Sequence, residues 1–393
     1  MNEIVILGAA RTPLGAFLGS LANVPAPQLG AVAIRGALLR AKVAPGDVTD
    51  CFMGNVIGAG LGQAPARQAA LAAGLPATTL TVTLNKVCGS GLQALWAGAQ
   101  ALATGSATLV VAGGMENMSA APHLLPRARE GWKFGHAQIL DALLHDGLWD
   151  PHHGQPMGKN AETCAAHYAF TREAQDAYAA ESFRRANAAQ AAGYFAAEIT
   201  PVEVVGAKGE VTSCEHDEGP AKVRYEKIPT LKPAFQPDGT ITAANASTLN
   251  DGAAALVLTT AATARASGLT PIARIVSFGA HAQEPLWFTT APVVATRQAL
   301  DRAGWTADEV DLWEINEAFA VVPMAFMREL GVSPEKVNVR GGAIALGHPL
   351  GASGARIVVT LLAALRERGL RRGVAAICIG GGEGLAVAVE IQP

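Results

Sequence analysis

The order of apolar and polar residues predicts alternating strands and helices. Near the start, Ile4-Val5-Ile6-Leu7 is a short continuous apolar run, which is typical of a buried strand. The stretch from Val87 to Met115 has no charged residue, but glycines interrupt it and it carries several Gln and Thr residues. Its apolar positions with helical spacing are Leu92, Leu95, Trp96 and Ala99. We therefore predict a buried helix followed by a buried strand, although the length alone would allow a membrane span.

The two ends of the sequence look like copies of one design, offset by about 262 residues. In the first copy, the strand-like segment Thr81–Leu84 leads to Cys88-Gly-Ser-Gly91. In the second copy, the strand-like segment Lys336–Val339 leads to Gly351-Ala-Ser-Gly354. Each Ser-Gly pair opens a helix, and each helix is followed by an apolar strand that ends in glycines. The repeat predicts two α/β halves with helices packed on their sheets.

The middle of the chain differs from both ends, because it is richer in Pro, His and charged residues. One clear helix runs from Arg172 to Ala192, capped by Thr171 and stopped by Gly193. Long insertions on α/β scaffolds commonly build the substrate site. We therefore divide the chain into an N-terminal half (1–118 plus 249–270), an inserted substrate-covering loop domain (119–248) and a C-terminal half (271–393).

The composition is that of a globular protein with a large interior. Half of the 393 residues are hydrophobic and 16% are charged, the opposite of a disordered composition. The net charge of −3, without any Lys/Arg-rich run, argues against a nucleic-acid partner or an anionic membrane surface. The five cysteines form an odd set with no CxxC pattern, so we expect no disulfide framework and a reducing cytoplasm.

Cys88 is the first candidate for chemistry, because it lies between a predicted strand and a predicted helix. The following Gly-Ser-Gly lets the backbone turn, and a helix N-terminus favours negative charge, so we expect a lowered thiol pKa. His348 precedes the second copy's helix, and it would reach the same seam if the halves pair about a pseudo-twofold axis. A base beside a thiol activates it. By position alone, a space-filling cysteine and a loop-capping histidine are equally good interpretations.

Three further candidates lie in the second copy. Cys378, at the end of the last apolar strand, could move protons to and from carbon, and the N–H of Gly380 could bind an oxyanion. The amide of Asn316 could position a water or polarise a carbonyl. Taken separately, Cys378 is more typical of a core cysteine, and Asn316 is equally typical of a turn. No single feature decides the function.

Taken together, the motifs resemble the thiolase family. Four segments at the candidate positions are similar to its signatures: Asn85-Lys-Val-Cys-Gly-Ser-Gly-Leu92, Asn316-Glu-Ala-Phe-Ala320, Gly347-His-Pro-Leu-Gly-Ala-Ser-Gly-Ala-Arg356 and Cys378-Ile-Gly-Gly-Gly382. Three more are Ile6-Leu-Gly-Ala-Ala-Arg-Thr-Pro13, Val111-Ala-Gly-Gly-Met-Glu-Asn117 and Asn245-Ala-Ser-Thr-Leu-Asn-Asp-Gly252. The similarity runs from the first strand to the last. It implies a five-layer α/β/α/β/α fold built from two pseudo-repeated halves, in homodimers or homotetramers.

The resemblance also implies a role for each candidate. Cys88 attacks and carries the acyl group as a thioester, and His348 activates it. Cys378 is the acid/base at the α-carbon. Asn316, through a water, and His348 form one oxyanion hole, and the N–H groups of Cys88 and Gly380 form the other. The implied activity is that of an acetyl-CoA C-acetyltransferase, which joins two acetyl-CoA into acetoacetyl-CoA and CoA. Acyl-CoA and CoA are then the substrates and products, and no other cofactor is expected.

Substrate contacts follow from the same resemblance. Ser247 meets the pantetheine arm, and five residues lie near the acyl pocket: Met157, Phe235, Phe288, Ala318 and Phe319. Without the resemblance, core or loop packing is an equally good interpretation of each. Pro156-Met157-Gly158 departs from the His-Met-Gly of short-chain biosynthetic thiolases and looks closer to some 3-ketoacyl-CoA thiolases. Pro220 stands where some relatives have a tyrosine near a potassium ion, so no metal is predicted.

Several alternatives stay open at this point. A degradative 3-ketoacyl-CoA thiolase of fatty-acid β-oxidation, with a preference for longer chains, would use the same catalytic residues. An acyl-condensing synthase of the wider superfamily is disfavoured by Cys378, because those enzymes place histidine or asparagine there. A non-catalytic acyl-CoA or lipid-binding relative would have lost a reactive residue. A nicotinamide dehydrogenase is disfavoured because the turn after the first strand lacks GxGxxG.

Overall fold

The computed structural model describes residues 3–206 and 208–392, and within them ten strands are hydrogen-bonded into one mixed sheet. In spatial order the main path is β14 (Leu312–Ile315), β15 (Arg372–Ile379), β16 (Glu383–Ile391), β13 (Ala273–Ala282), β1 (Ile4–Arg11), β12 (Asn250–Thr260), β5 (Leu109–Asn117), β3 (Asp50–Gly54) and β4 (Leu80–Leu84). The short β2 (Gly15–Ala16) pairs with β12. The two halves of the path join where β1 pairs with β13, from Ile4 opposite Ile275 to Ile6 opposite Ala273.

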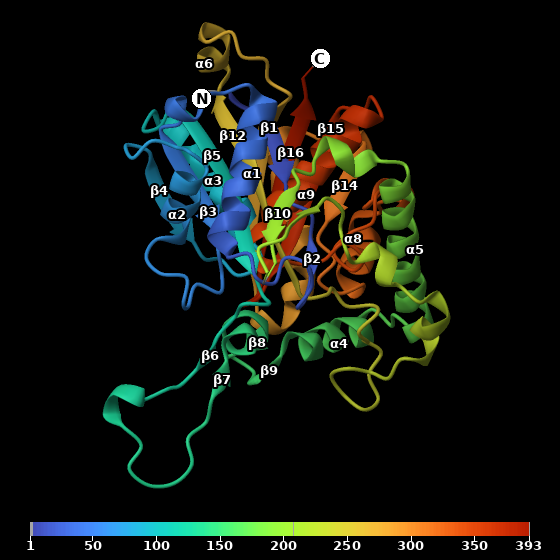
Figure 1. The fold of residues 1–393 in the computed structure, drawn as a ribbon. Helices are drawn as coiled ribbons and strands as arrows, with labels where there is room; N and C mark the ends of the chain where they lie inside the picture. Colours follow the sequence, from blue (N-terminus) through green and yellow to red (C-terminus); the bar gives the residue numbers. More distant parts are fainter. Residues whose placement is uncertain (1–2, 207, 393) are drawn as a thin grey trace.

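The sheet packs as two halves that face each other across a central pair of helices (Figure 1). These helices are α3 (Ser90–Thr104) and α9 (Leu350–Glu367), and their apolar residues share one core cluster with strands of both halves. The outer face of the first half is covered by α1 (Ala26–Ala41) and α2 (Pro65–Ala72). The outer face of the second half is covered by α7 (Ala291–Ala303) and α8 (Val321–Leu330). The predicted five-layer α/β/α/β/α arrangement of two repeated halves is thereby confirmed.

The uncharged stretch folds as predicted, into a helix followed by a strand. Helix α3 ends where Gly105 adopts a left-handed φ of 76°, and every residue of β5 is buried. No helix in the described part of the chain is long and apolar enough to cross a membrane. All five cysteines are free thiols.

One predicted strand is absent from its place in the second half. Lys336–Val339 was expected to match β4, but it forms only isolated bridges, from Val337 to Trp313 and from Val339 to Gly341. The reason is Asn338, whose φ of 48° is left-handed. Its side-chain amide accepts from the N–H of Ile315 and donates to the carbonyl of Ile315, both at 2.8 Å. A side chain thus occupies the hydrogen-bonding positions that a neighbouring strand would fill.

The inserted segment lies against both halves and extends beyond them. Its main helices are α4 (Met157–His167) and α5 (Arg172–Ala191), and Thr171 caps α5 by accepting from the N–H of Ala174, as predicted. The short strands are β6 (His123–Leu124), β7 (Leu140–Asp141), β8 (Trp149–Asp150), β9 (Gln155–Pro156), β10 (Val202–Val205) and β11 (Val211–Cys214), and helix α6 (Ala261–Ala266) follows β12. The loop between β6 and β7 projects away from the body of the molecule (Figure 1). The division of the chain at residues 118, 248 and 270 stays a prediction.

The beginnings of α3 and α9 meet at glycines. A Cβ atom on Gly91 would lie 2.7 Å from the backbone nitrogen of Ala355, and one on Gly354 would lie 2.4 Å from that of Leu92. Real side chains do not tolerate such contacts, so only glycine allows the two helix N-termini to come this close. The loops that precede the two helices, one from each half, are therefore brought to one place.

Candidate active site

Cys88 sits in a strained turn between β4 and α3. Val87, a β-branched residue, has a left-handed φ of 46°, which is an unfavourable backbone conformation. Ser90 stabilises this turn, because its hydroxyl accepts from the N–H of Lys86 at 2.8 Å and donates to the carbonyl of Val87 at 2.7 Å. The cysteine packs beside an apolar cluster that contains Leu350, at the start of α9, and its side chain remains partly exposed.

The prediction of a lowered thiol pKa at Cys88 is wrong for the free protein. Burial raises the pKa of Cys88 to about 11, and the nearby carboxyl of Glu116 also raises it. The backbone N–H groups of Gly380 and of Cys88 itself lie near the sulfur and lower the pKa, but they do not offset the burial. The resting side chain is therefore a thiol, and a base has to remove its proton when it reacts.

Cys378 and Gly380 reach the same place from the end of β15. Cys378 is fully buried, and burial followed by the proximity of Cys88 raises its thiol pKa well above the ordinary value. Gly380 presents its N–H to the Cys88 sulfur. A Cβ atom on Gly380 would lie 3.5 Å from a methyl carbon of Val87 and 3.6 Å from the terminal carbon of Met157. The structure thus brings together Cys88, Cys378, Gly380 and Met157.

His348 is buried just before α9, with its ring held in one tautomer. The hydroxyl of Ser353 donates to the carbonyl of Pro349 at 2.9 Å and lies 2.6 Å from Nδ1 of His348. Because a hydroxyl that donates to the carbonyl accepts from the ring, we infer that Nδ1 carries the proton and Nε2 keeps its lone pair. Burial, and then the charge of Arg356, lower the pKa of His348 to about 3. The imidazole is therefore neutral near pH 7.

Asn316 lies beside the free nitrogen of that ring. Its side-chain nitrogen is 3.4 Å from Nε2 of His348, and its buried side-chain oxygen has no hydrogen-bond partner among residues 3–206 and 208–392. The next residue, Glu317, accepts from Tyr178, Ser182, Asn338 and the N–H of Ile344, all within 3.0 Å. This buried carboxylate connects the end of β14 to the loop that leads to His348.

The residues predicted for the acyl pocket form one apolar cluster over Cys378. Phe319 makes edge-to-face contacts with Phe235 and Phe288, at ring-centroid distances of 6.0 and 6.3 Å. Met157 packs on the same cluster, and Ala318 accepts from the N–H of Ser247 at 3.0 Å. All six predicted substrate residues therefore lie next to one another.

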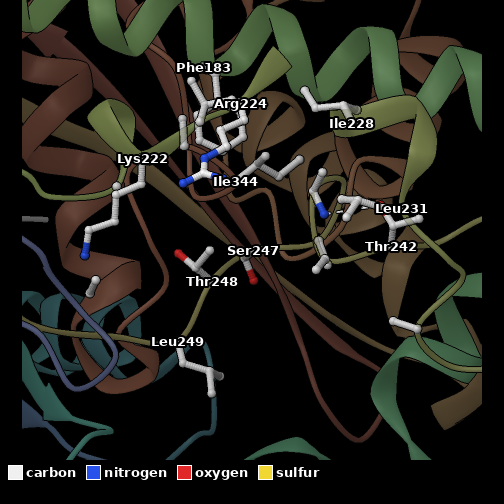
Figure 2. Close-up of a pocket in the computed structure, with 18 of the residues that line it drawn as sticks. Phe183, Lys222, Arg224, Ile228, Leu231, Thr242, Ser247, Thr248, Leu249 and Ile344 are labelled. Carbon is white, nitrogen blue, oxygen red and sulfur yellow. Dashed lines mark hydrogen bonds between the residues drawn. The ribbon is translucent and has the colours of Figure 1, made fainter. Parts of the chain in front are cut away.

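A cavity of about 820 Å³ opens beside this cluster (Figure 2). Lys222 and Arg224 lie on one side of it, and Ile228 and Leu231 lie on the other. Ser247 and Phe235 line it, whereas Cys88 does not. Asn250 connects the two regions, because it lines the cavity and accepts from the N–H of His348 at 3.1 Å.

Sequence reasoning gave no role to four side chains that hold this site: Glu116, Asn250, Glu317 and Ser353. All four stand inside the segments that resemble family signatures. Glu116 also carried a signal of its own, since it is a lone acidic residue at the end of an apolar strand. Its hydrogen-bond partners are far away in the sequence, so this signal did not identify them.

The chain matches known proteins over almost its whole length. The family described as "Thiolase, N-terminal domain" matches residues 4–262, and "Thiolase, C-terminal domain" matches residues 269–391. An acetyl-CoA acetyltransferase of Pseudomonas aeruginosa is 51% identical over 98% of this chain and 99% of its own. One of Schizosaccharomyces pombe is 49% identical over 99% of both chains.

Solved structures give the same result. A thiolase from Ascaris suum in complex with coenzyme A superposes with a TM-score of 0.94 at 46% identity, over 99% of this chain and 100% of its own. The acetyl-CoA acetyltransferase of Bacillus anthracis superposes with a TM-score of 0.97 at 40% identity, over 100% of this chain and 99% of its own.

The fold and its relatives together define an acyltransferase built from two repeated α/β halves, and Cys88 and His348 lie just before the two helices that meet between the halves. The chain belongs to the thiolase family.

We predict that Ser353→Ala slows alkylation of Cys88 by iodoacetamide about tenfold or more near neutral pH. Without the serine oxygen, Nδ1 of His348 loses its acceptor, and the base at Nε2 is no longer maintained. Labelling of Cys88 is followed by peptide mass spectrometry. Ser277→Ala is the matched control, since this buried serine donates to the carbonyl of Ala299 on another part of the fold. An unchanged rate in folded Ser353→Ala would contradict the assigned tautomer.

Proposed function

We propose that this chain is an acetyl-CoA C-acetyltransferase, which interconverts two acetyl-CoA with acetoacetyl-CoA and CoA. The observation that carries the proposal is the convergence of two thiols, Cys88 and Cys378, with the N–H of Gly380 at the helix seam. Relatives about half identical over the full length, which are named acetyl-CoA acetyltransferases, support this activity. Coenzyme A is then substrate and product, and no resident cofactor takes part.

In the direction of cleavage, the sulfur of Cys88 attacks the keto carbon of acetoacetyl-CoA. Its proton passes to Nε2 of His348, whose neutral ring makes it able to accept. The N–H groups of Cys88 and Gly380 lie near this sulfur, where they would bind a developing oxyanion. Losing one such donor costs about 3 kcal/mol of transition-state stabilisation.

The carbon–carbon bond then breaks, and Cys378 provides the proton that the leaving carbon needs. The bonding electrons move onto the α-carbon, which takes the Cys378 proton and leaves as acetyl-CoA, while the acetyl group stays on Cys88. The proton on His348 passes to the Cys378 thiolate and restores both groups. The high pKa of Cys378 makes its thiolate a strong base, and this is what removal of a carbon-bound proton requires in the direction of synthesis.

The second half-reaction transfers the acetyl group to CoA. His348 accepts the proton of the CoA thiol, and the CoA sulfur attacks the acetyl carbon. Cys88 leaves as thiolate and regains its proton from His348, so the enzyme returns to its starting state. The side-chain oxygen of Asn316, which has no partner in the described part of the chain, can accept from a water, and its side-chain nitrogen lies beside Nε2, where it can donate to a substrate oxygen.

We propose that the inserted segment, residues 119–248, holds the substrate over this site. Its residues Met157 and Phe235 meet Phe319 of the second half, and its Lys222 and Arg224 give the cavity a basic side suited to the phosphates of CoA. Glu218 lies 3.8 Å from Lys222, so Arg224 is the less encumbered of the two.

A degradative thiolase with a preference for longer chains is the second candidate. It would need an acyl pocket that extends beyond the acetyl position. Phe319 contacts both Phe235 and Phe288 edge to face, and we infer that these rings limit the acyl pocket and favour a short acyl group.

We further propose a homodimer or homotetramer in a reducing cytoplasm. The free state of all five cysteines supports the compartment. Leu80 and Val82 are exposed on β4, at the edge of the sheet, where a strand invites further pairing. Trp132 and Phe134 are exposed on the projecting loop, and Phe134 is fully exposed. Contact of these apolar side chains with water is unfavourable, so we infer that another copy of the chain covers them.

We expect the purified protein to consume acetoacetyl-CoA in the presence of CoA, with longer 3-ketoacyl-CoA substrates turned over more slowly. Cys88→Ala abolishes the reaction, because the acetyl group then has no carrier. Cys214→Ala, at another partly exposed thiol, keeps it. Loss of the 3-ketoacyl-CoA is followed by absorbance. Faster turnover of long chains would favour the degradative thiolase, and no turnover by folded, reduced protein would contradict the enzyme.

Static light scattering tests the assembly. We expect two or four times the mass of one chain, and a smaller mass when Trp132 and Phe134 are both changed to Ser, because their apolar contacts are lost. Leu39→Ser, at an exposed leucine of α1, is the control and leaves the mass unchanged. A wild-type protein with the mass of one chain would contradict the proposal.

A further inference from the structure

Glu116 is a fully buried carboxylate that the proposed reaction does not use. It lies near the end of β5 and accepts from four donors. One oxygen accepts from the side chain of Asn55 at 2.9 Å and from the N–H of Ile57 at 3.1 Å. The other accepts from the N–H of Val56 at 3.0 Å and from the N–H of Gly351 at 2.9 Å. Three donors belong to the first half, and the fourth belongs to the second.

The first-half donors form the loop after β3, which is tied to the nucleophile. Val56 and Ile57 belong to the apolar cluster on which Cys88 packs. The N–H of Asn55 donates to the carbonyl of Leu84 at 2.9 Å, and this carbonyl stands at the end of β4, four residues before Cys88. Any shift of this loop therefore moves the apolar residues that pack beside Cys88.

The second-half donor belongs to the segment that carries the base. Gly351 lies in the first turn of α9, between His348 and Ser353. The helix has no side-chain cap of its own, so Glu116 supplies a negative charge to its N-terminus from the other half. The approach is tight, since a Cβ atom on Gly351 would lie 2.6 Å from the carbonyl oxygen of Met115.

We propose that Glu116 is a positioning residue for the reaction. Its ionised carboxylate holds the loop of residues 55–57, which packs beside Cys88, in a fixed position relative to the start of α9, which follows His348. This inference rests on the proposed function, because it assigns Glu116 to the step in which His348 takes the Cys88 proton. All four groups around the carboxylate are donors. A protonated carboxyl, which must itself donate, cannot accept from all of them.

The side chain of Glu116 changes its charge state near neutral pH. Burial raises the pKa of Glu116 to about 7, against the lowering effect of the three backbone N–H groups. The ionisable groups that face it are Asp251 on β12, which raises this pKa further, and the Cys88 thiol. The carboxylate is ionised above this pH and protonated below it. The register of the two halves should therefore weaken as the pH falls.

The test is Glu116→Gln, which keeps the shape but presents an NH₂ group to N–H donors. We expect alkylation of Cys88 by iodoacetamide and kcat for acetoacetyl-CoA thiolysis to fall about 10- to 100-fold, as for a small misalignment of reacting groups. KM should change little, because Glu116 does not line the cavity. We expect kcat of the wild type to fall below pH 7, where Glu116 becomes protonated, and we expect this fall to be absent from the variant. Glu390→Gln, a mostly buried carboxylate at the far end of β16, is the matched control and keeps wild-type rates.

If Glu116 acted only through its charge, the substitution would change the alkylation rate of Cys88 in the opposite direction. Its charge raises the pKa of Cys88, so removing only that effect would make alkylation faster. Unchanged or faster alkylation in a Glu116→Gln protein of wild-type Tm would overturn the proposal. A kcat of this variant that still falls below pH 7 would overturn it as well. If this variant does not fold, Asn55→Ala removes one donor, and we expect a loss of about 3- to 10-fold. No loss there would also overturn it. The alkylation readout needs no substrate, so it stays informative even if thiolysis fails in the wild type.

Discussion

The close contact between the N-termini of α3 and α9 is the constraint on which the rest of the structure depends. Gly91 and Gly354 allow it, because a side chain at either position would meet backbone of the opposite helix. Each helix follows a loop that carries one residue of the proposed reaction, Cys88 in the first half and His348 in the second. The internal repeat therefore has a chemical consequence: equivalent positions of two similar halves deliver different groups to one seam.

The reactive groups at this seam are uncharged at rest. Burial raises the pKa of both thiols and lowers that of His348, so neither a thiolate nor an imidazolium is maintained in the free protein. In the proposed reaction, catalysis depends on proton transfer during the reaction rather than on an ion pair already present in the free protein. This makes position decisive, and it explains why buried polar side chains such as Ser353 and Glu317 surround the site.

The sequence allowed the two repeated halves, the helix capped by Thr171 and the candidate reactive residues to be predicted, because each has a local pattern or a repeated one. The prediction of a strand at Lys336–Val339 was wrong, because the apolar alternation of this segment does not reveal the left-handed Asn338, whose side chain replaces a strand. The prediction of a lowered pKa for the Cys88 thiol was wrong, because the sequence shows that this residue stands at a helix start but does not show its burial. Glu116 was missed because its contact with Gly351 spans 235 residues.

We propose that the acyl group passes through Cys88 and that Cys378 acts only on protons. The most direct test is to mix the protein with acetyl-CoA, quench in acid and locate the added acetyl group by peptide mass spectrometry, in the wild type and in Cys378→Ala. We predict acetylation of Cys88 in both proteins, since Cys378 is not needed to load the acetyl group. An acetyl group on Cys378, or none on Cys88 in folded and reduced protein, would contradict it.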